Sequence, residues 1–376
     1  DEDMDVVIQG LTAITIKQIV LWAIGGVLIY LAVAKDFEPA LLLPMGFGAI
    51  IVNIPLSGAV TQVIDGTAVE GILDILFKVG ITTELFPLLI FIGIGAMIDF
   101  GPILQNPFML LFGGAAQFGI FFTICLAGLL GFPLKEAASI GIIGAADGPT
   151  SIYVATKFAP NLLGPISIAA YSYMALVPVI QPWAIKLVTS KKERQIRMTY
   201  KPESVSQTTK IVFPIAITIV TGLIAPNAVP LIAFLMFGNL LRECKVLDSL
   251  SDTAQHELVN IITILLGITI AATMQAEKFI TIQTGMIIAL GLVAFIFDTV
   301  GGVLFAKFLN LFRTEKVNPM IGAAGISAFP MSARVIQKMA QKEDNQNFIL
   351  MFAVGANVAG QIASVIAGGL VLMLVH

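Results

Sequence analysis

Long apolar runs separated by short polar stretches extend over most of the chain. The runs cover residues 18–34, 39–53, 86–98, 107–132, 137–158, 162–188, 211–225, 228–241, 257–275, 283–309, 318–336 and 346–375. A transmembrane helix needs about 20 mostly apolar residues, and several of these runs are shorter or interrupted by Gly and Pro. The pattern therefore predicts an all-α integral membrane protein with roughly nine to eleven crossings and two broken or re-entrant helical elements.

The composition agrees with a lipid environment. Of 376 residues, 57% are hydrophobic and 12% are charged, whereas soluble proteins average about 25% charged residues. The net charge is −3 and no basic tract alternates with aromatic residues, so we expect no nucleic-acid partner. Two cysteines and two histidines argue against a disulfide framework or a Cys/His metal or haem site.

Polar segments divide the chain into parts. Residues 1–17 form an N-terminal lead-in whose acidic start differs from the basic start of a signal peptide. The mixed polar stretch 53–84 is expected to be a loop. A basic loop at 189–210 separates a first membrane half, 18–188, from a second, 211–376, and the positive-inside rule places this loop in the cytoplasm. Its basic residues are Lys191, Lys192, Arg194, Arg197, Lys201 and Lys210.

Three short sequence matches recur in the same order in both halves. IGAA at 143–146 returns at 321–324, LLIFIGIGAMID at 88–99 resembles ITILLGITIAAT at 262–273, and MGFG at 45–48 resembles LMFG at 235–238. The matches indicate an internal duplication. Inverted repeats with broken helices are a common plan of secondary transporters, so an inverted-repeat, transporter-like bundle is expected.

The first broken helix is predicted at 137–158, where Asp147 is followed by Gly148 and Pro149. Pro cannot continue a helix and Gly permits the chain to leave it, so the break should fall at 147–149. Freed carbonyls at membrane depth need partners, and a cation held by Asp147, with the nearby hydroxyl of Ser151, would supply them. Oxygen ligands suit a hard cation such as Na⁺. The alternative is that Asp147 lies near the surface and caps a helix.

The second broken helix is predicted at 318–336, where Gly and two Pro residues interrupt the apolar run. Asn318 offers an amide oxygen and Ser327 a hydroxyl, while Gly325 occupies the position that corresponds to Asp147. A site built from both halves would then hold one acid and several neutral oxygens, which suits a monovalent ion. Arg334 ends the segment and either pairs with a carboxylate or extends to the lipid headgroups.

Other polar side chains inside apolar runs allow two interpretations each. Tyr173, beside Tyr171, either lies near Asp147 or belongs to an interfacial aromatic belt. Asn357 and Gln361 are four residues apart and share a helix face, where with Ser364 they either bind the ion or join helices by hydrogen bonds.

Asp298 is the other acid deep in an apolar run. It is either a second ion or proton site, or the partner of Lys307 nearer the membrane edge.

The chain resembles one family through several long motifs. They are IGAADGPTSIY (143–153), AAYSYMALVPVIQP (169–182), KKERQIRM (191–198), VNPMIGAAGISAFPMSAR (317–334) and NFILMFAVGANVAGQI (347–362). Together, over residues 20–376, they resemble the β subunit of the sodium-pumping biotin-dependent decarboxylases, which act on oxaloacetate, methylmalonyl-CoA, glutaconyl-CoA or malonate. IGAAD replaces the more usual IGGAD, and NPM stands where NPL is also common. The long insertion typical of the oxaloacetate branch is missing, which favours an acyl-CoA branch.

The resemblance implies a division of labour. A carboxyltransferase α subunit moves CO₂ from the substrate to biotin on a carrier subunit, and a small membrane-anchored subunit completes the complex. The β subunit, expected to be oligomeric and in the cytoplasmic membrane of a bacterium or archaeon, then decarboxylates carboxybiotin and couples this to Na⁺ export with proton uptake. No biotin-accepting Ala-Met-Lys-Met tetrapeptide occurs in the sequence, so a partner must supply the biotin.

The resemblance also assigns roles to residues. Positions used by the family for ion binding or the coupled reaction are Asp147, Tyr173, Asn318, Gly322, Ser327 and Arg334, and Asn357 is expected to join the ion site. Arg334, with Ser327, would hold the carboxylated biotin, and Asp147 with Tyr173 would relay the proton.

Two rival interpretations remain. A Na⁺/H⁺ antiporter or other Na⁺-coupled transporter without decarboxylase chemistry would show the same repeats and broken helices. A passive membrane scaffold would not need its buried polar residues.

Overall fold

Helices make up nearly all of the regular structure in the computed structural model, which describes residues 2–376. The first half of the chain contains α1 (Glu2–Thr12), α2 (Ile16–Lys35), α3 (Pro39–Val52), α4 (Ile72–Phe77), α5 (Leu85–Met97), α6 (Gly101–Gln105), α7 (Leu110–Ala115), α8 (Phe118–Leu129), α9 (Leu134–Gly141), α10 (Gly148–Phe158), α11 (Leu163–Ala175), α12 (Val177–Val188) and α13 (Lys191–Arg194). The second half contains α14 (Gln207–Ile224), α15 (Val229–Glu243), α16 (Asp248–Thr253), α17 (Val259–Ile270), α18 (Ala276–Phe279), α19 (Ile282–Leu309), α20 (Met320–Ala323), α21 (Met331–Glu343) and α22 (Leu350–Leu374).

Within residues 2–376, six helices are long and apolar enough to cross a membrane, and up to eight spans result if two bent helix pairs each count as one. The bends are 57° between 72–82 and 85–97, and 74° between 160–175 and 177–188. The all-α membrane class predicted from the sequence is confirmed. Neither predicted broken element is part of these counts, because each is divided into short helices.

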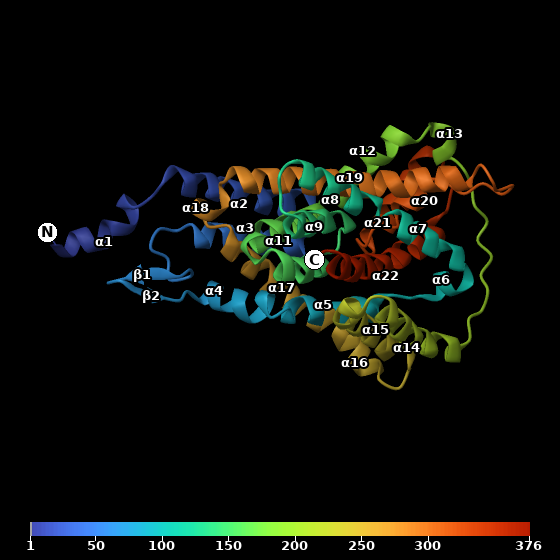
Figure 1. The fold of residues 1–376 in the computed structure, drawn as a ribbon, viewed down its shortest axis with the longest axis horizontal. Helices are drawn as coiled ribbons and strands as arrows, with labels where there is room; N and C mark the ends of the chain where they lie inside the picture. Colours follow the sequence, from blue (N-terminus) through green and yellow to red (C-terminus); the bar gives the residue numbers. More distant parts are fainter. Residues whose placement is uncertain (1) are drawn as a thin grey trace.

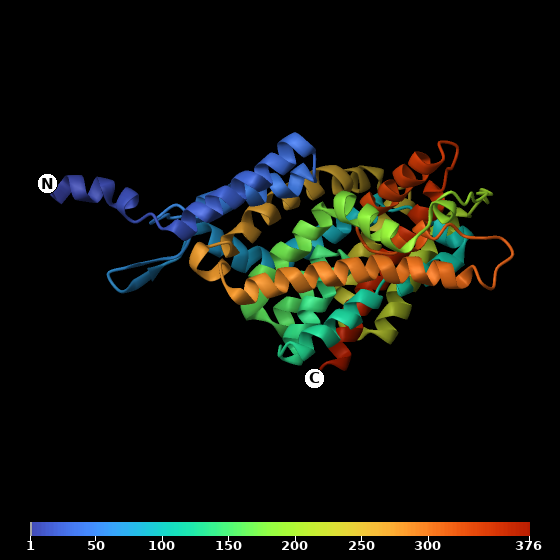
Figure 2. The ribbon, with the colours of Figure 1, turned by 90° about the horizontal axis from the view of Figure 1, so that it is seen from above.

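Local sequence explains where the long helices begin. The Thr15 hydroxyl accepts a hydrogen bond from the backbone N–H of Gln18, whose side chain in turn accepts from the Thr15 N–H, and this capping box starts α2. The Thr281 hydroxyl caps α19 by accepting a hydrogen bond from the Thr284 N–H. The 28 residues of α19 then form a long helix that runs parallel to the long axis of the molecule (Figures 1 and 2).

The two halves of the chain interlock rather than form separate bodies. Helix α5 packs on α15, α3 on α17, α8 on α19 and α7 on α22, so each of these pairs joins one helix of the first half to one of the second. One shared core results, and its polar residues come from both halves.

The two ends of the molecule differ in character. At one end α1 projects beside a small hairpin of β1 (Gln62–Ile64) and β2 (Thr67–Val69), within the stretch expected to be a loop (Figures 1 and 2). Asp65 and Gly66 form its turn with φ of 51° and 77°, as a tight hairpin turn requires. The basic loop with α13 lies at the opposite end, which the positive-inside rule assigns to the cytoplasm.

Candidate functional site

The first helix break falls where the sequence predicts it. After α9, residues 142–145 form a single 3₁₀ turn, and Ala146 then adopts a left-handed conformation with φ 53°. Asp147 begins α10 as its N-cap: its Oδ1 accepts from the Thr150 N–H at 3.1 Å and its Oδ2 from the Thr150 hydroxyl at 2.6 Å. Only 3% of Asp147 is exposed. The carboxylate therefore caps a helix, but in the interior and not at the surface.

The second break meets the first. After α20, residues 324–330 leave helical geometry before α21 begins. The Ser327 N–H donates to the Ala145 carbonyl at 3.0 Å, which joins the two breaks through their backbones. The Ser327 hydroxyl donates to the Ser364 hydroxyl and to the Gly360 carbonyl. Ser364 donates in turn to Asp147 Oδ2 at 2.9 Å. Both breaks and α22 thus contribute to one buried polar cluster.

Helix α22 supplies further oxygens to this cluster. Asn357 donates from Nδ2 to the Ile326 carbonyl at 2.8 Å, and Gln361 donates from Nε2 to the Ser327 carbonyl. Their side-chain oxygens are buried and have no hydrogen-bond partner among residues 2–376. Buried oxygens without donors are costly, and a cation beside them would supply the partner. The donor set, one carboxylate with amide and hydroxyl oxygens, fits Na⁺ as transported cargo.

Tyr171 packs against the first helix break. A Cβ added at Gly148 would collide with the Tyr171 ring, so Gly is required there. Tyr171 is 1% exposed, and its hydroxyl has no partner in the described part of the chain. The hydroxyl of Tyr173 donates instead to the Ile288 carbonyl, and its ring stacks on Phe295 at 6.5 Å between centroids. Both tyrosines are buried, which disfavours the interfacial-belt interpretation of Tyr173, and the tyrosine that contacts the first break is Tyr171.

One further predicted residue lies near each break. Ser151 donates to the Asp147 carbonyl at 2.9 Å, one turn into α10. Gly322 packs so closely on the Gly302 backbone of α19 that a side chain at either position would collide with the other. The role visible for Gly322 is therefore helix packing.

Asn318 points to the basic loop and not to the buried cluster. Its Nδ2 donates to the carbonyls of Arg194 and Ile196, each at 3.0 Å, and its Oδ1 accepts from the Met320 N–H at 3.1 Å. In this conformation Asn318 links the basic loop to the start of the second broken element, and the structure does not bring it to Asp147, Ser327 and Asn357.

Arg334 lies on α21 beside a separate cavity of about 530 Å³. The cavity is bounded by the α2–α3 turn, α12 and α21, and its charged lining residues are Asp36, Glu38, Lys186, Arg334, Lys338, Lys342 and Glu343. Lys186 is close in sequence to the basic loop, so the cavity lies toward the end of the molecule that the positive-inside rule assigns to the cytoplasm. It is large enough for a small ring compound and carries one more positive charge than negative.

Asp298 has a structural partner. Its Oδ1 accepts from the Ile120 N–H at 3.0 Å and so caps the start of α8, while Oδ2 has no partner among the described residues. Lys307 bonds instead to Glu193 at 3.3 Å and to the Val188 carbonyl at 3.0 Å, so its proposed pairing with Asp298 is wrong.

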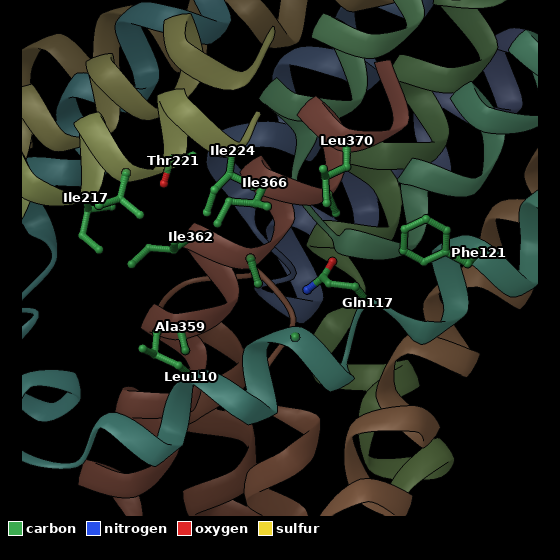
Figure 3. A pocket seen from close by; sticks show the side chains of 14 residues that line it. Leu110, Gln117, Phe121, Ile217, Thr221, Ile224, Ala359, Ile362, Ile366 and Leu370 are labelled. Atoms are coloured by element: carbon green, nitrogen blue, oxygen red, sulfur yellow. The ribbon is translucent and has the colours of Figure 1, made fainter. Parts of the chain in front are cut away.

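A second cleft, of about 430 Å³, lies between α14, α22 and the α7–α8 junction (Figure 3). Its lining is apolar except for Gln117 and Thr221, and the Gln117 side chain donates to the Gly113 carbonyl at 2.9 Å. Without a charged side chain, this cleft is a poor ion site, which leaves the Asp147 cluster as the candidate.

Fold and site together define the class: a multi-pass membrane protein whose two broken helices meet at a buried acid, the design of an ion-coupled transporter. The chain matches the family model described as Na⁺-transporting oxaloacetate decarboxylase beta subunit over residues 17–375. It therefore belongs to the family of sodium-transporting decarboxylase β subunits. The family predicted from the motifs is confirmed, and it is favoured over an antiporter.

Individual relatives agree with this assignment. The chain is 51% identical to the glutaconyl-CoA decarboxylase subunit beta of Acidaminococcus fermentans, over 98% of this chain and 96% of that protein. It is 48% identical to the methylmalonyl-CoA decarboxylase subunit beta of Propionigenium modestum, over 97% and 96%. Identity to the oxaloacetate decarboxylase beta chain of Klebsiella pneumoniae is 44%, over 100% and 99%. The higher identities to acyl-CoA enzymes agree with the expected branch.

Proposed function

We propose that this chain takes carboxybiotin from a biotin carrier subunit, removes its CO₂, and uses the reaction to export Na⁺ as a proton enters. A carboxyltransferase α subunit and a small membrane-anchored subunit would complete the complex. The substrate class that fits the relatives is an acyl-CoA. The observation that carries the proposal is the position of one short segment: Ser327 in the buried cluster and Arg334 at the cytoplasmic cavity are seven residues apart on the same broken element.

The cavity suits the carboxylated group. Arg334 is exposed toward it and offers the paired N–H groups that bind a carboxylate best. Pro178 and Pro182 of α12 add apolar surface to the lining, and a partly dry pocket favours loss of CO₂ because charge spreads away from the carboxylate as the bond breaks. Arg334 also stabilises the carboxylate before the bond breaks. It therefore orients the carboxybiotin but cannot by itself account for the acceleration of the decarboxylation.

The buried cluster suits the cation. Asp147, Ser327 and Asn357 would hold Na⁺, with Ser151 and Ser364 alongside, and Asp147 exchanges Na⁺ for a proton because one carboxylate accommodates one positive partner at a time. Moving one charge against 100 mV requires about 2.3 kcal/mol. Residues 324–334 would couple the two sites. The reaction at Arg334 would displace this segment and so move Ser327 relative to Asp147.

The direct test is ²²Na⁺ uptake into liposomes that contain the purified chain. Uptake should require a carboxylated biotin carrier and proceed in step with CO₂ release, and Asp147→Asn should abolish uptake. Carrier-independent uptake driven equally by a pH gradient would refute the proposal, as would retained uptake in the Asp147→Asn variant.

A further inference from the structure

An acidic side chain shares the cytoplasmic cavity with Arg334. Glu38 lies in the short turn between α2 and α3, immediately before Pro39, which begins α3. It lines the same cavity as Arg334, which α21 carries. No hydrogen bond to the Glu38 carboxyl is present among residues 2–376, so this group is free to act on a molecule in the cavity.

The backbone holds Glu38 in an unusual conformation. Its φ is 36° and that of Asp36 is 57°, so two residues of three in this turn are left-handed without being glycine. Such conformations are uncommon for residues with side chains and are concentrated at functional sites. The Glu38 carbonyl accepts the N–H groups of Leu41 and Leu42, each at 3.0 Å, and so anchors the turn to the first turn of α3. These bonds use only the backbone, so the side chain can be replaced without losing them.

The surroundings favour the protonated form of the Glu38 carboxyl. Burial raises the pKa of Glu38 above its ordinary value of 4.5, the positive charge of Arg334 opposes this, and the negative charge of Asp36 adds to it. The net direction is upward, as for carboxyl groups that act as general acids. The other charged groups that line the cavity are Lys186, Lys338, Lys342 and Glu343.

We propose that Glu38 is the general acid of the decarboxylation, donating its proton to the biotin ureido nitrogen while Arg334 holds the departing carboxylate. The N–C bond breaks, the carbon leaves as CO₂, and the bonding electron pair stays on nitrogen. The Glu38 proton forms the new N–H bond and Glu38 becomes a carboxylate. The proposal concerns only the group that donates a proton directly to the ureido nitrogen. It holds whether Glu38 is then reprotonated from one side of the membrane or from the other. It rests on the function proposed above, which left the donor at the cavity unassigned.

The variants Glu38→Gln and Glu38→Ala test this role, with Glu315→Gln as the control. Glu315 is an exposed acid in the loop after α19, outside the cavity. With a carboxylated carrier as substrate, Glu38→Gln should lower kcat for CO₂ release about a hundredfold or more, the usual range of general acid catalysis. Carrier affinity should stay within a few-fold, because Arg334 still binds the carboxylate. Formate or acetate should restore much of the Glu38→Ala rate, since a small acid fills the vacated space.

A spectroscopic measurement of the Glu38 carboxyl, which does not depend on catalysis, completes the test. Infrared difference spectra of the purified chain should contain a protonated-carboxyl band at pH values above 4.5 that Glu38→Gln lacks. Near-normal kcat in Glu38→Gln, or an inactive Glu38→Ala that no small acid restores, overturns the role of Glu38 while leaving the proposed function intact. Absence of carrier-dependent CO₂ release by the wild-type chain would instead overturn the proposed function itself.

Discussion

Ser364 is the side chain that joins Asp147 to the second broken helix. It donates to Asp147 Oδ2 at 2.9 Å and accepts from the Ser327 hydroxyl. Replacement of Ser364 by Ala removes both bonds at once and leaves the backbone link between Ser327 and Ala145 in place. The variant therefore separates the role of the hydroxyl chain from that of the backbone contact.

The size of the effect follows from the kind of bond that is lost. A hydrogen bond to a charged group contributes about 1.5–3 kcal/mol. If Ser364 helps to hold the ionised form of Asp147 that binds Na⁺, its loss should raise the half-saturating Na⁺ concentration about ten- to a hundredfold, at about 1.4 kcal/mol for each factor of ten. The missing link to Ser327 should also lower the number of Na⁺ ions moved for each CO₂ released.

Liposomes that contain the chain and a carboxylated carrier permit both measurements, as ²²Na⁺ uptake against Na⁺ concentration and as the Na⁺/CO₂ ratio. Ser167→Ala is a matched control, because Ser167 is equally buried but donates only to the Leu163 carbonyl of its own helix, at 2.6 Å. An unchanged half-saturation together with an unchanged ratio in Ser364→Ala would refute the assignment of this cluster as the coupled ion site.

Three further outcomes are expected. Arg334→Lys should retain charge but lose the paired N–H geometry, so KM for the carboxylated carrier should rise about tenfold while Na⁺ affinity in a binding assay stays the same; an equal loss of both would contradict the separation of cavity and ion site. Asn318→Ala should release the basic loop, seen as faster proteolysis at 191–198, whereas a change in Na⁺ affinity without faster cleavage would favour the ligand role. The Arg197 hydrogen bonds lower the pKa of Asp344 below its ordinary 3.8, so this contribution is present above that pH and is lost as pH falls through the lowered pKa. Loop cleavage should therefore increase at acid pH in the wild type, and Asp344→Asn should show the increase already at neutral pH.

The membrane class, the family and the position of the first break were predictable from the sequence because each depends on local composition. Apolar runs predict helices in lipid, and Asp147-Gly148-Pro149 cannot continue a helix. The hairpin at 62–69 was missed within the expected loop, although the Asp65-Gly66 pair is a recognisable hairpin turn. Interlocking of the halves was also beyond prediction, because helix pairing between distant segments depends on packing surfaces that no short motif specifies.

The composition of the site was predicted in part. The structure places Asp147, Ser151, Ser327 and Asn357 at the two helix breaks and the facing part of α22, while their role as ion ligands stays a prediction. The distinction between Tyr171 and Tyr173 required the structure. Successive residues of a helix are rotated by about 100° around its axis, so the side chains of two residues that are two positions apart point to different faces. The close packing of the Tyr171 ring on Gly148, where an added Cβ would collide with it, shows which tyrosine faces the break.

Arg334 and Asp147 were expected to act in one process, and the structure places them at different polar sites. The connection between them is the non-helical stretch 324–330, which is fixed to the first break by the Ser327 N–H and continues directly into α21. A segment without internal helical bonds can change its backbone angles at less cost than a helix can. Coupling needs such an element with two arrangements that both sites favour differently, and residues 324–330 are the part of the chain whose backbone would have to provide them if the two sites are coupled.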